Sequence, residues 1–238
     1  MGAVAAIVCA ISIIVLIYAA IMRRKASRIT KAEHLQSGAA SQAPNGKAVS
    51  VQGNPVAQPL VSPVTGTQCL YYEVEVEGFW KDGDTKKSKT YYEDKQGQVG
   101  VDDGSGVVPL NLAGGGDFDL KQTFSEKHKE GMFDDLKNAV GKGKPVVFGN
   151  FNFTNPVNSK ASEFVCTEKV FVAEGSVYAA GYMKEGVISS KGLFSLLVSP
   201  KTREQLLDDA MGNAKKAFMG GGIGLAVGTV VGIISNFM

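Results

Sequence analysis

Two long stretches without a charged side chain constrain this sequence most. One covers residues 2–22 and the other residues 217–238, so the 25 basic and 23 acidic residues all lie outside them. A helix over residues 2–22 is about 31 Å long, which matches the hydrocarbon core of a bilayer. The pattern predicts a membrane protein with two transmembrane helices flanking a mainly-β (α+β) soluble domain.

The first stretch resembles an uncleaved membrane anchor more than a secretory signal, because no basic residue precedes it. Basic residues lie instead on the domain side of both stretches: Arg23, Arg24, Lys25, Arg28, Lys215 and Lys216. By the positive-inside rule this places the domain in the cytoplasm and both termini outside. We expect a prokaryotic inner membrane, with an organelle envelope as the alternative.

The second stretch carries glycine at every fourth position, namely Gly220, Gly224, Gly228 and Gly232. Residues four apart share one helix face, and glycine there lets a second helix approach closely. The stripe predicts a helix-packing surface over residues 217–237. Its partner is the first helix, a second copy of the chain or another membrane protein.

The middle of the chain divides into three segments. Residues 23–46 are expected to form a juxtamembrane helix and a linker, residues 47–198 a β-rich domain, and residues 199–216 an amphipathic helix with Ser199 as its N-cap. Residues 68–78 alternate apolar and acidic side chains, which predicts a strand with one wet face and a turn at Asp82-Gly83. Apolar residues at helical spacing predict a further helix over residues 126–140.

Three blocks within residues 47–198 resemble the GIDE domain, also called the beside-a-membrane domain. They are a Ser-Pro…Gly…Cys…Tyr-Tyr opening, a Tyr…Asp…Gly…Val strand–turn–strand and a Glu…Gly…Val-Tyr…Gly block. The positions that match the motifs are Pro63, Gly66, Cys69, Tyr72, Asp94, Gly97, Glu168, Gly175 and Gly181. The family comprises the membrane-flanked domain of mitochondrial and chloroplast-envelope RING ubiquitin ligases and prokaryotic relatives without the RING.

The resemblance does not extend to the chemistry of the ligases. No Cys or His follows Cys166, so the eight zinc ligands of a RING are missing. Cys69 and Cys166 are the domain's two thiols and His128 is its one histidine, which makes a Cys–His catalytic pair a minor alternative to buried packing thiols. We expect no catalytic residues, no metal site and no cofactor.

The near-balance of charge gives no basic surface for nucleic acid. The favoured hypothesis is therefore a membrane-anchored, non-enzymatic binding or scaffold protein that associates through its glycine stripe. Its partners would be the lipid bilayer and either a second copy or another membrane protein. The alternative is a ligand- or lipid-binding accessory subunit of a membrane enzyme or complex.

Overall fold

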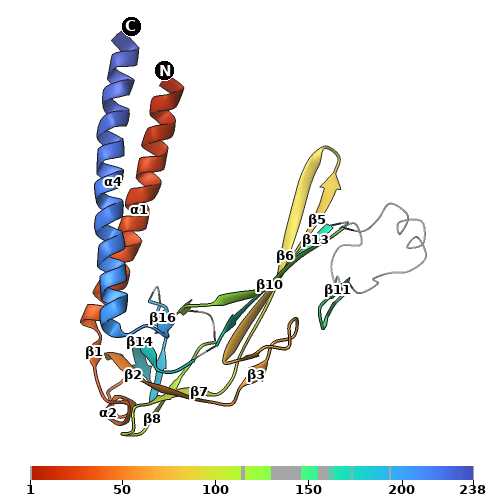
Figure 1. Cartoon of the computed structure of the whole chain (residues 1–238), viewed down its shortest axis with the longest axis vertical. Helices are drawn as coiled ribbons and strands as arrows, with labels where there is room; N and C mark the ends of the chain where they lie inside the picture. The colour runs from red at the N-terminus through yellow and green to blue at the C-terminus, as the bar shows by residue number, and fades with distance from the viewer. Residues whose placement is uncertain are drawn as a thin grey trace, which may run out of the picture.

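The computed structural model shows two helices and a β-sheet arm that extend from a small β-barrel (Figure 1). It describes residues 2–113, 116–129, 146–154, 161, 163–172, 174–192 and 194–237, with side chains described from residue 6 to residue 224. The helices are α1 (Gly2–Lys31), α2 (Ser37–Ser41) and α4 (Arg203–Phe237). The short α2 lies inside the expected linker, where Ser37 and Ala40 are buried.

Strands make up most of the remaining described chain. Those of the barrel and its extensions are β1 (Glu33–His34), β2 (Ala48–Ala57), β7 (Val99–Asp102), β8 (Val107–Leu110), β9 (Gly116–Phe118), β14 (Val177–Lys184), β15 (Val187–Ser189) and β16 (Leu196–Ser199). Those of the arm are β3 (Leu60–Val61), β4 (Gln68–Cys69), β5 (Tyr71–Asp82), β6 (Thr85–Gln96), β10 (Lys121–Lys129), β11 (Val146–Phe148), β12 (Phe151–Phe153) and β13 (Glu163–Phe171).

The barrel closes through five strands in the order β2–β7–β8–β15–β14, with β14 pairing back onto β2. Four of the five pairings are antiparallel, and the β8–β15 pairing is parallel and joins only Leu110 to Ile188. Alternate residues of these strands point inward because side chains alternate across a strand. Val49, Val51, Val101 and Val108 are among those that fill the interior.

The main sheet of the arm is four-stranded and antiparallel, in the order β10–β13–β5–β6, and the pairs β3–β4 and β11–β12 form two smaller sheets. Tyr72, Val74 and Val76 of β5 are buried in a second core with Phe164 and Cys166 of β13. The alternation predicted for residues 68–78 is therefore confirmed over β5, and so is the turn after Asp82. The β5–β6 hairpin extends beyond this core to the same side as the free ends of α1 and α4 (Figure 1).

A third apolar cluster joins the helices to the outside of the barrel. Ile29 of α1 and Leu206 of α4 pack with Tyr178 and Ala180 of β14 and Leu197 of β16. The two helices run antiparallel from this contact, side by side (Figure 1). Burial at their base fixes where both helices leave the barrel.

The expectation of two transmembrane helices flanking a soluble domain is wrong. Among the described residues one helix, Ala6–Lys31, is long and apolar enough to cross a membrane. The part of α4 with described side chains ends at Gly224, and its earlier turns carry Asp208, Asp209, Lys215 and Lys216. These charges are too many for a span within those residues.

Two local expectations also fail. Residues 126–129 belong to strand β10, where Glu126 lies opposite Cys166 of β13, and residues 130–140 lie outside the described residues. Ladder hydrogen bonds to β13 outweigh the helical pattern there. Ser199 lies in β16, opposite Tyr178 of β14, and α4 instead begins after Thr202.

Candidate functional site

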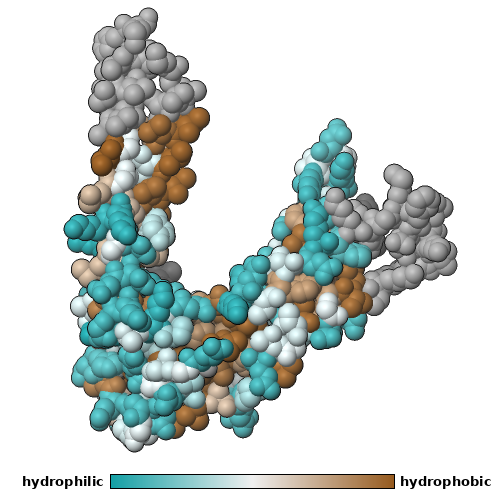
Figure 2. All heavy atoms as spheres, in the orientation of Figure 1, coloured by the Kyte–Doolittle hydropathy of each residue, from teal (hydrophilic) through white to brown (hydrophobic). Residues whose placement is uncertain are grey.

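The surface of α1 beyond the barrel is strongly apolar. Ile7, Ile11, Ile14, Ile17 and Ile21 are all more than half exposed, and Ile14 is 65% exposed. Figure 2 shows this brown surface above the polar surface of the barrel. The core helix of a soluble protein would bury such side chains, so the exposure favours contact with lipid or with another apolar surface.

The basic end of α1 is held against the barrel. Lys25 Nζ lies 2.9 Å from Asp117 Oδ1, and Arg28 Nη1 lies 3.9 Å from the other oxygen of that carboxylate. Arg28 also donates a hydrogen bond to the carbonyl of Ser195. Two of the six predicted interface cations are thus part of a clasp between α1 and the domain.

The other four cations remain at the surface. Arg23, Arg24, Lys215 and Lys216 are exposed and make no ion pair with a described acidic residue. Their charges lie where the apolar length of α1 ends. This band of basic residues is what an anionic headgroup layer would contact.

Two of the described glycines of α4 face α1, in a register that the sequence did not indicate. A Cβ on Gly224 would lie 2.3 Å from Ser12 Oγ, and one on Gly221 would lie 2.9 Å from Leu16 Cδ2. A Cβ on Gly220 would meet nothing within 4 Å. Gly221 and Gly224 are thus the described close contacts with α1, while the packing of Gly228 and Gly232 lies outside the described side chains.

Glu168 is a fully buried carboxylate on β13 and the anchor of the Ser62–Thr67 loop. It accepts hydrogen bonds from Val64 N–H at 2.9 Å, from the Thr65 hydroxyl at 2.6 Å and from the Thr123 hydroxyl at 2.7 Å. Burial raises the pKa of this carboxyl, but these hydrogen bonds outweigh burial and hold the pKa below its ordinary value. The carboxylate therefore holds a loop in place and stays ionised.

The other motif positions are structural as well. Tyr72 donates to Glu93, and Asp94 accepts from the hydroxyl of Tyr71. A Cβ on Gly97 would lie 2.4 Å from the carbonyl oxygen of Gln58, and one on Gly181 2.8 Å from that of Ser189, so both glycines permit close backbone approach. Two further motif glycines, Gly66 and Gly175, lie in turns and have positive φ. Pro63 is half-buried in the loop that Glu168 anchors.

Neither thiol of the domain is activated. Burial, with a smaller contribution from the Glu168 carboxylate, raises the pKa of Cys69 to about 11 and that of Cys166 to about 12. Both are free and buried in the second core, whereas His128 is exposed on β10. Within the described part of the chain, no group of three or more His, Cys, Asp or Glu is arranged to hold a metal ion.

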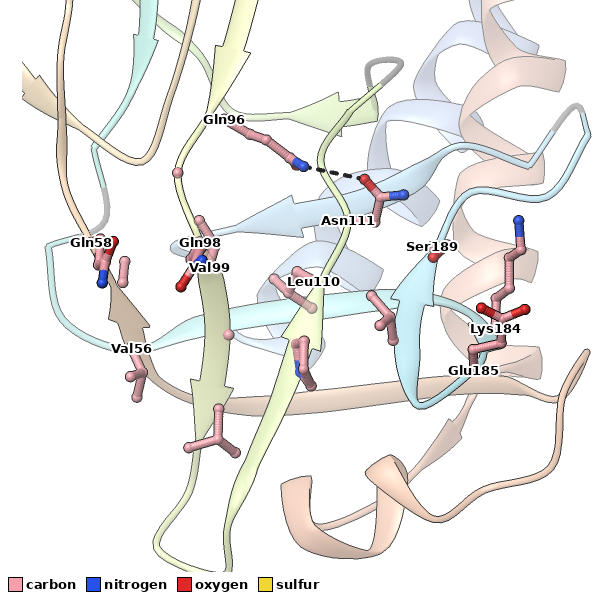
Figure 3. Close-up of a pocket in the computed structure, with 16 residues that line it drawn as sticks. Val56, Gln58, Gln96, Gln98, Val99, Leu110, Asn111, Lys184, Glu185 and Ser189 are labelled. Carbon is pink, nitrogen blue, oxygen red and sulfur yellow. Dashed lines mark hydrogen bonds between the residues drawn. The ribbon is translucent and has the colours of Figure 1, made fainter.

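An open groove of about 850 Å³, which the sequence did not predict, runs across the outside of the barrel. Its apolar floor comes from β2, β7, β8 and β15, with Val56 and Val107 each 46% exposed. Gln58 and Gln98 lie on one side of the groove and Lys184 and Glu185 on the other (Figure 3). One signal was available, since residues 107–110 place apolar Val107 and Pro109 on the exposed face of β8.

One amide in this groove has an oxygen without a hydrogen-bond partner among the described residues. Gln96 Nε2 donates to Asn111 Oδ1 at 3.4 Å, and the same oxygen accepts from Ala113 N–H at 3.1 Å (Figure 3). Because Asn111 presents an acceptor, the amide of Gln96 is oriented with its nitrogen toward it. Gln96 Oε1 is then buried, and no group in the described part of the chain donates a hydrogen bond to it. A buried acceptor of this kind is a place for an N–H or O–H group of a ligand.

Comparison with known proteins gives no relative to set beside this site. No family model matches the chain, and no curated protein and no solved structure matches it either.

Proposed function

We propose that this protein is a membrane-anchored, non-enzymatic binding or scaffold protein that presents a β-barrel and its sheet beside a bilayer. The observation that carries the proposal is the exposed apolar surface of α1, which continues into a basic end clasped to the barrel through Asp117. An anchor attached in this way holds the barrel at the headgroup level. The basic residues on the domain side favour a cytoplasmic barrel at a prokaryotic inner membrane.

The GIDE resemblance stays a prediction about family. The motif positions that support it serve turns, close backbone approach and the Glu168 anchor, which are fold-building roles. Such roles agree with a module whose shared residues specify a scaffold rather than a catalytic set. Ubiquitin-ligase activity forms no part of the proposal.

Fractionation of the full chain, tagged at each end, tests the anchor. We expect the protein in the membrane pellet after an alkaline wash with both tags retained, and in the soluble fraction when Ile14 and Ile17 are changed to Asp. Val56→Asp, a matched charge on an exposed valine of the barrel, should stay in the pellet. A soluble product without its N-terminal tag would identify α1 as a cleaved signal, and a soluble intact chain would identify it as a protein contact; either would overturn the proposal.

The barrel groove supports the second candidate function, a ligand-binding accessory subunit. Its volume lies within the range of small-molecule sites, and Gln96 Oε1 provides an acceptor that no described residue satisfies. A photo-crosslinker at Val107 distinguishes the two functions, with Ser88 on the β5–β6 hairpin as the control position. Val187 also lines the groove, so Val187→Arg should block a partner there. An adduct of protein mass that is lost in this variant favours the scaffold, whereas a small-molecule adduct favours the accessory subunit. The absence of an adduct at Val107 would exclude the groove as a binding site in both candidate functions.

A further inference from the structure

A second hollow lies between α1 and α4, separate from the barrel groove. Its volume is about 560 Å³, and one face of each helix lines it. Leu16 and Ala20 of α1 and Phe218 of α4 provide apolar walls, and the small side chains of Ala20 and Ala214 leave the space. Arg23 of α1 and Lys215 of α4 are also part of the lining.

The register of the two helices brings these cations to one level. Gly224 contacts Ser12, so equal steps toward the barrel along the antiparallel helices reach opposite positions. Arg23 is eleven residues from Ser12 and Lys215 is nine from Gly224. At about 1.5 Å per residue the two positions differ by about 3 Å along the axis. Arg23 and Lys215 therefore line the hollow at nearly the same level along the helix axes.

We propose that this hollow binds one anionic phospholipid, with its phosphate on Arg23 and Lys215 and an acyl chain against Leu16 and Phe218. Neither cation has an ion pair with a described acidic residue, so their charge is available to a ligand. Leu16 and Phe218 lie toward the free helix ends from the two cations, where an acyl chain would point, and Ala26 and Met211 line the hollow on the barrel side. This inference rests on the proposed membrane association through α1.

The proposed ligand needs both a net negative charge and an acyl chain. A zwitterionic lipid with the same chains would fill the apolar part, but its own ammonium group offsets its phosphate, so its net charge of zero compensates the pair of cations less. A soluble glycerol phosphate would meet the cations without burying apolar area. Only a molecule with both parts uses the whole lining.

Purified full chain in mild detergent, titrated with fluorescent phosphatidylglycerol, tests the site. We expect saturable binding that unlabelled phosphatidylglycerol displaces and that phosphatidylcholine or glycerol phosphate does not. The double variant Arg23→Gln, Lys215→Gln should weaken binding about 25-fold, taking about fivefold for each charge. Ala20→Leu, which fills the hollow and keeps both charges, should also weaken it.

Matched variants separate the site from general attraction. Arg24→Gln with Lys216→Gln removes the same charge one residue away from the lining, and Ala10→Leu adds the same bulk elsewhere on α1; both should bind like the unchanged chain. Equal loss in the two double variants, no saturable binding, or displacement of lipid by a second copy of the chain would overturn the proposal. Membrane fractionation of the same variants reports on anchoring separately, because all of them retain the apolar length of α1.

Discussion

At the scale of single residues, polar side chains at the motif positions of the sequence hold the fold together. Glu168 illustrates this, since its carboxylate accepts from Val64, Thr65 and Thr123 while fully buried. Removing one partner of such a set leaves buried donors without an acceptor, which costs more than an average hydrogen bond contributes. The residue is therefore a stability determinant of the arm.

Glu168→Gln should lower the free energy of unfolding by about 2 kcal/mol at neutral pH. The folded-state pKa of Glu168 lies below its ordinary value of 4.5, so the ionised carboxylate stabilises the fold above that pH. The difference between the two proteins should shrink as the pH falls below 4.5 and through the folded-state pKa. Denaturant titrations at several pH values measure it, with the exposed Glu75→Gln as the control. A constant difference at all pH values would contradict the assignment.

Gly224→Ala and Gly220→Ala should have different effects on stability, since the first should lower it and the second should not. Alanine favours a helix over glycine by about 1 kcal/mol, so Gly220→Ala, whose Cβ meets nothing, should stabilise α4 or leave it unchanged. Gly224→Ala drives its Cβ into Ser12, whose hydroxyl already donates to Val8 O at 2.8 Å. It should lower the melting temperature in detergent, and equal shifts for the two variants would contradict the observed register.

At the scale of elements, pairing with strands far along the chain outweighs local sequence patterns. β10 extends through residues that have a helical apolar pattern, because β13 pairs with it from Lys121 to Lys129, with one register shift between Gln122 and Phe124. The start of α4 is decided by reciprocal hydrogen bonds between Thr202 and Gln205, a capping box. Ser199, the expected cap, instead pairs in β16 and bonds to Asp119.

The clasp between α1 and β9 should respond to Asp117→Asn. Lys25 and Arg28 both reach this partly buried carboxylate, so its loss should cost about 1 kcal/mol and loosen the base of α1. Hydrogen–deuterium exchange should rise in β9 and in the last turns of α1. Asp209→Asn, which removes the exposed Lys201 pair, should leave both segments unchanged. Unchanged exchange in Asp117→Asn would show that the ion pairs of Asp117 do not hold α1 against the barrel.

At the scale of the whole molecule, α1, α4 and the β5–β6 hairpin all extend from the barrel to the same side (Figure 1). The hairpin ends in Phe79, Trp80 and a set of lysines, with Lys86 Nζ 4.3 Å from the centre of the Phe79 ring. Aromatic and basic side chains together suit a bilayer interface. If α1 is embedded in a bilayer, the hairpin points toward the same bilayer.

Trp80 reports on that geometry because it is the one tryptophan in the sequence. In proteoliposomes, lipids brominated near the headgroup should quench its fluorescence, and lipids brominated near the chain end should quench it less. Phe79→Ser with Lys86→Gln, which removes the neighbouring ring and cation, should reduce the quenching. Absence of quenching by either lipid would show that the hairpin stays away from the bilayer.

The sequence by itself determined the features that depend on neighbours in the chain. The uncharged length before Arg23, the alternation in Tyr72–Val76 and the turn after Asp82 all follow from local period and composition. Only the tertiary structure decided the rest. Barrel closure depends on β2 meeting β14, the barrel groove on Val56 and Val187 lining the same hollow, and the helix register on Gly221 meeting Leu16. Such contacts join distant residues, and their geometry is set by how two cores and two helices pack together rather than by any local pattern.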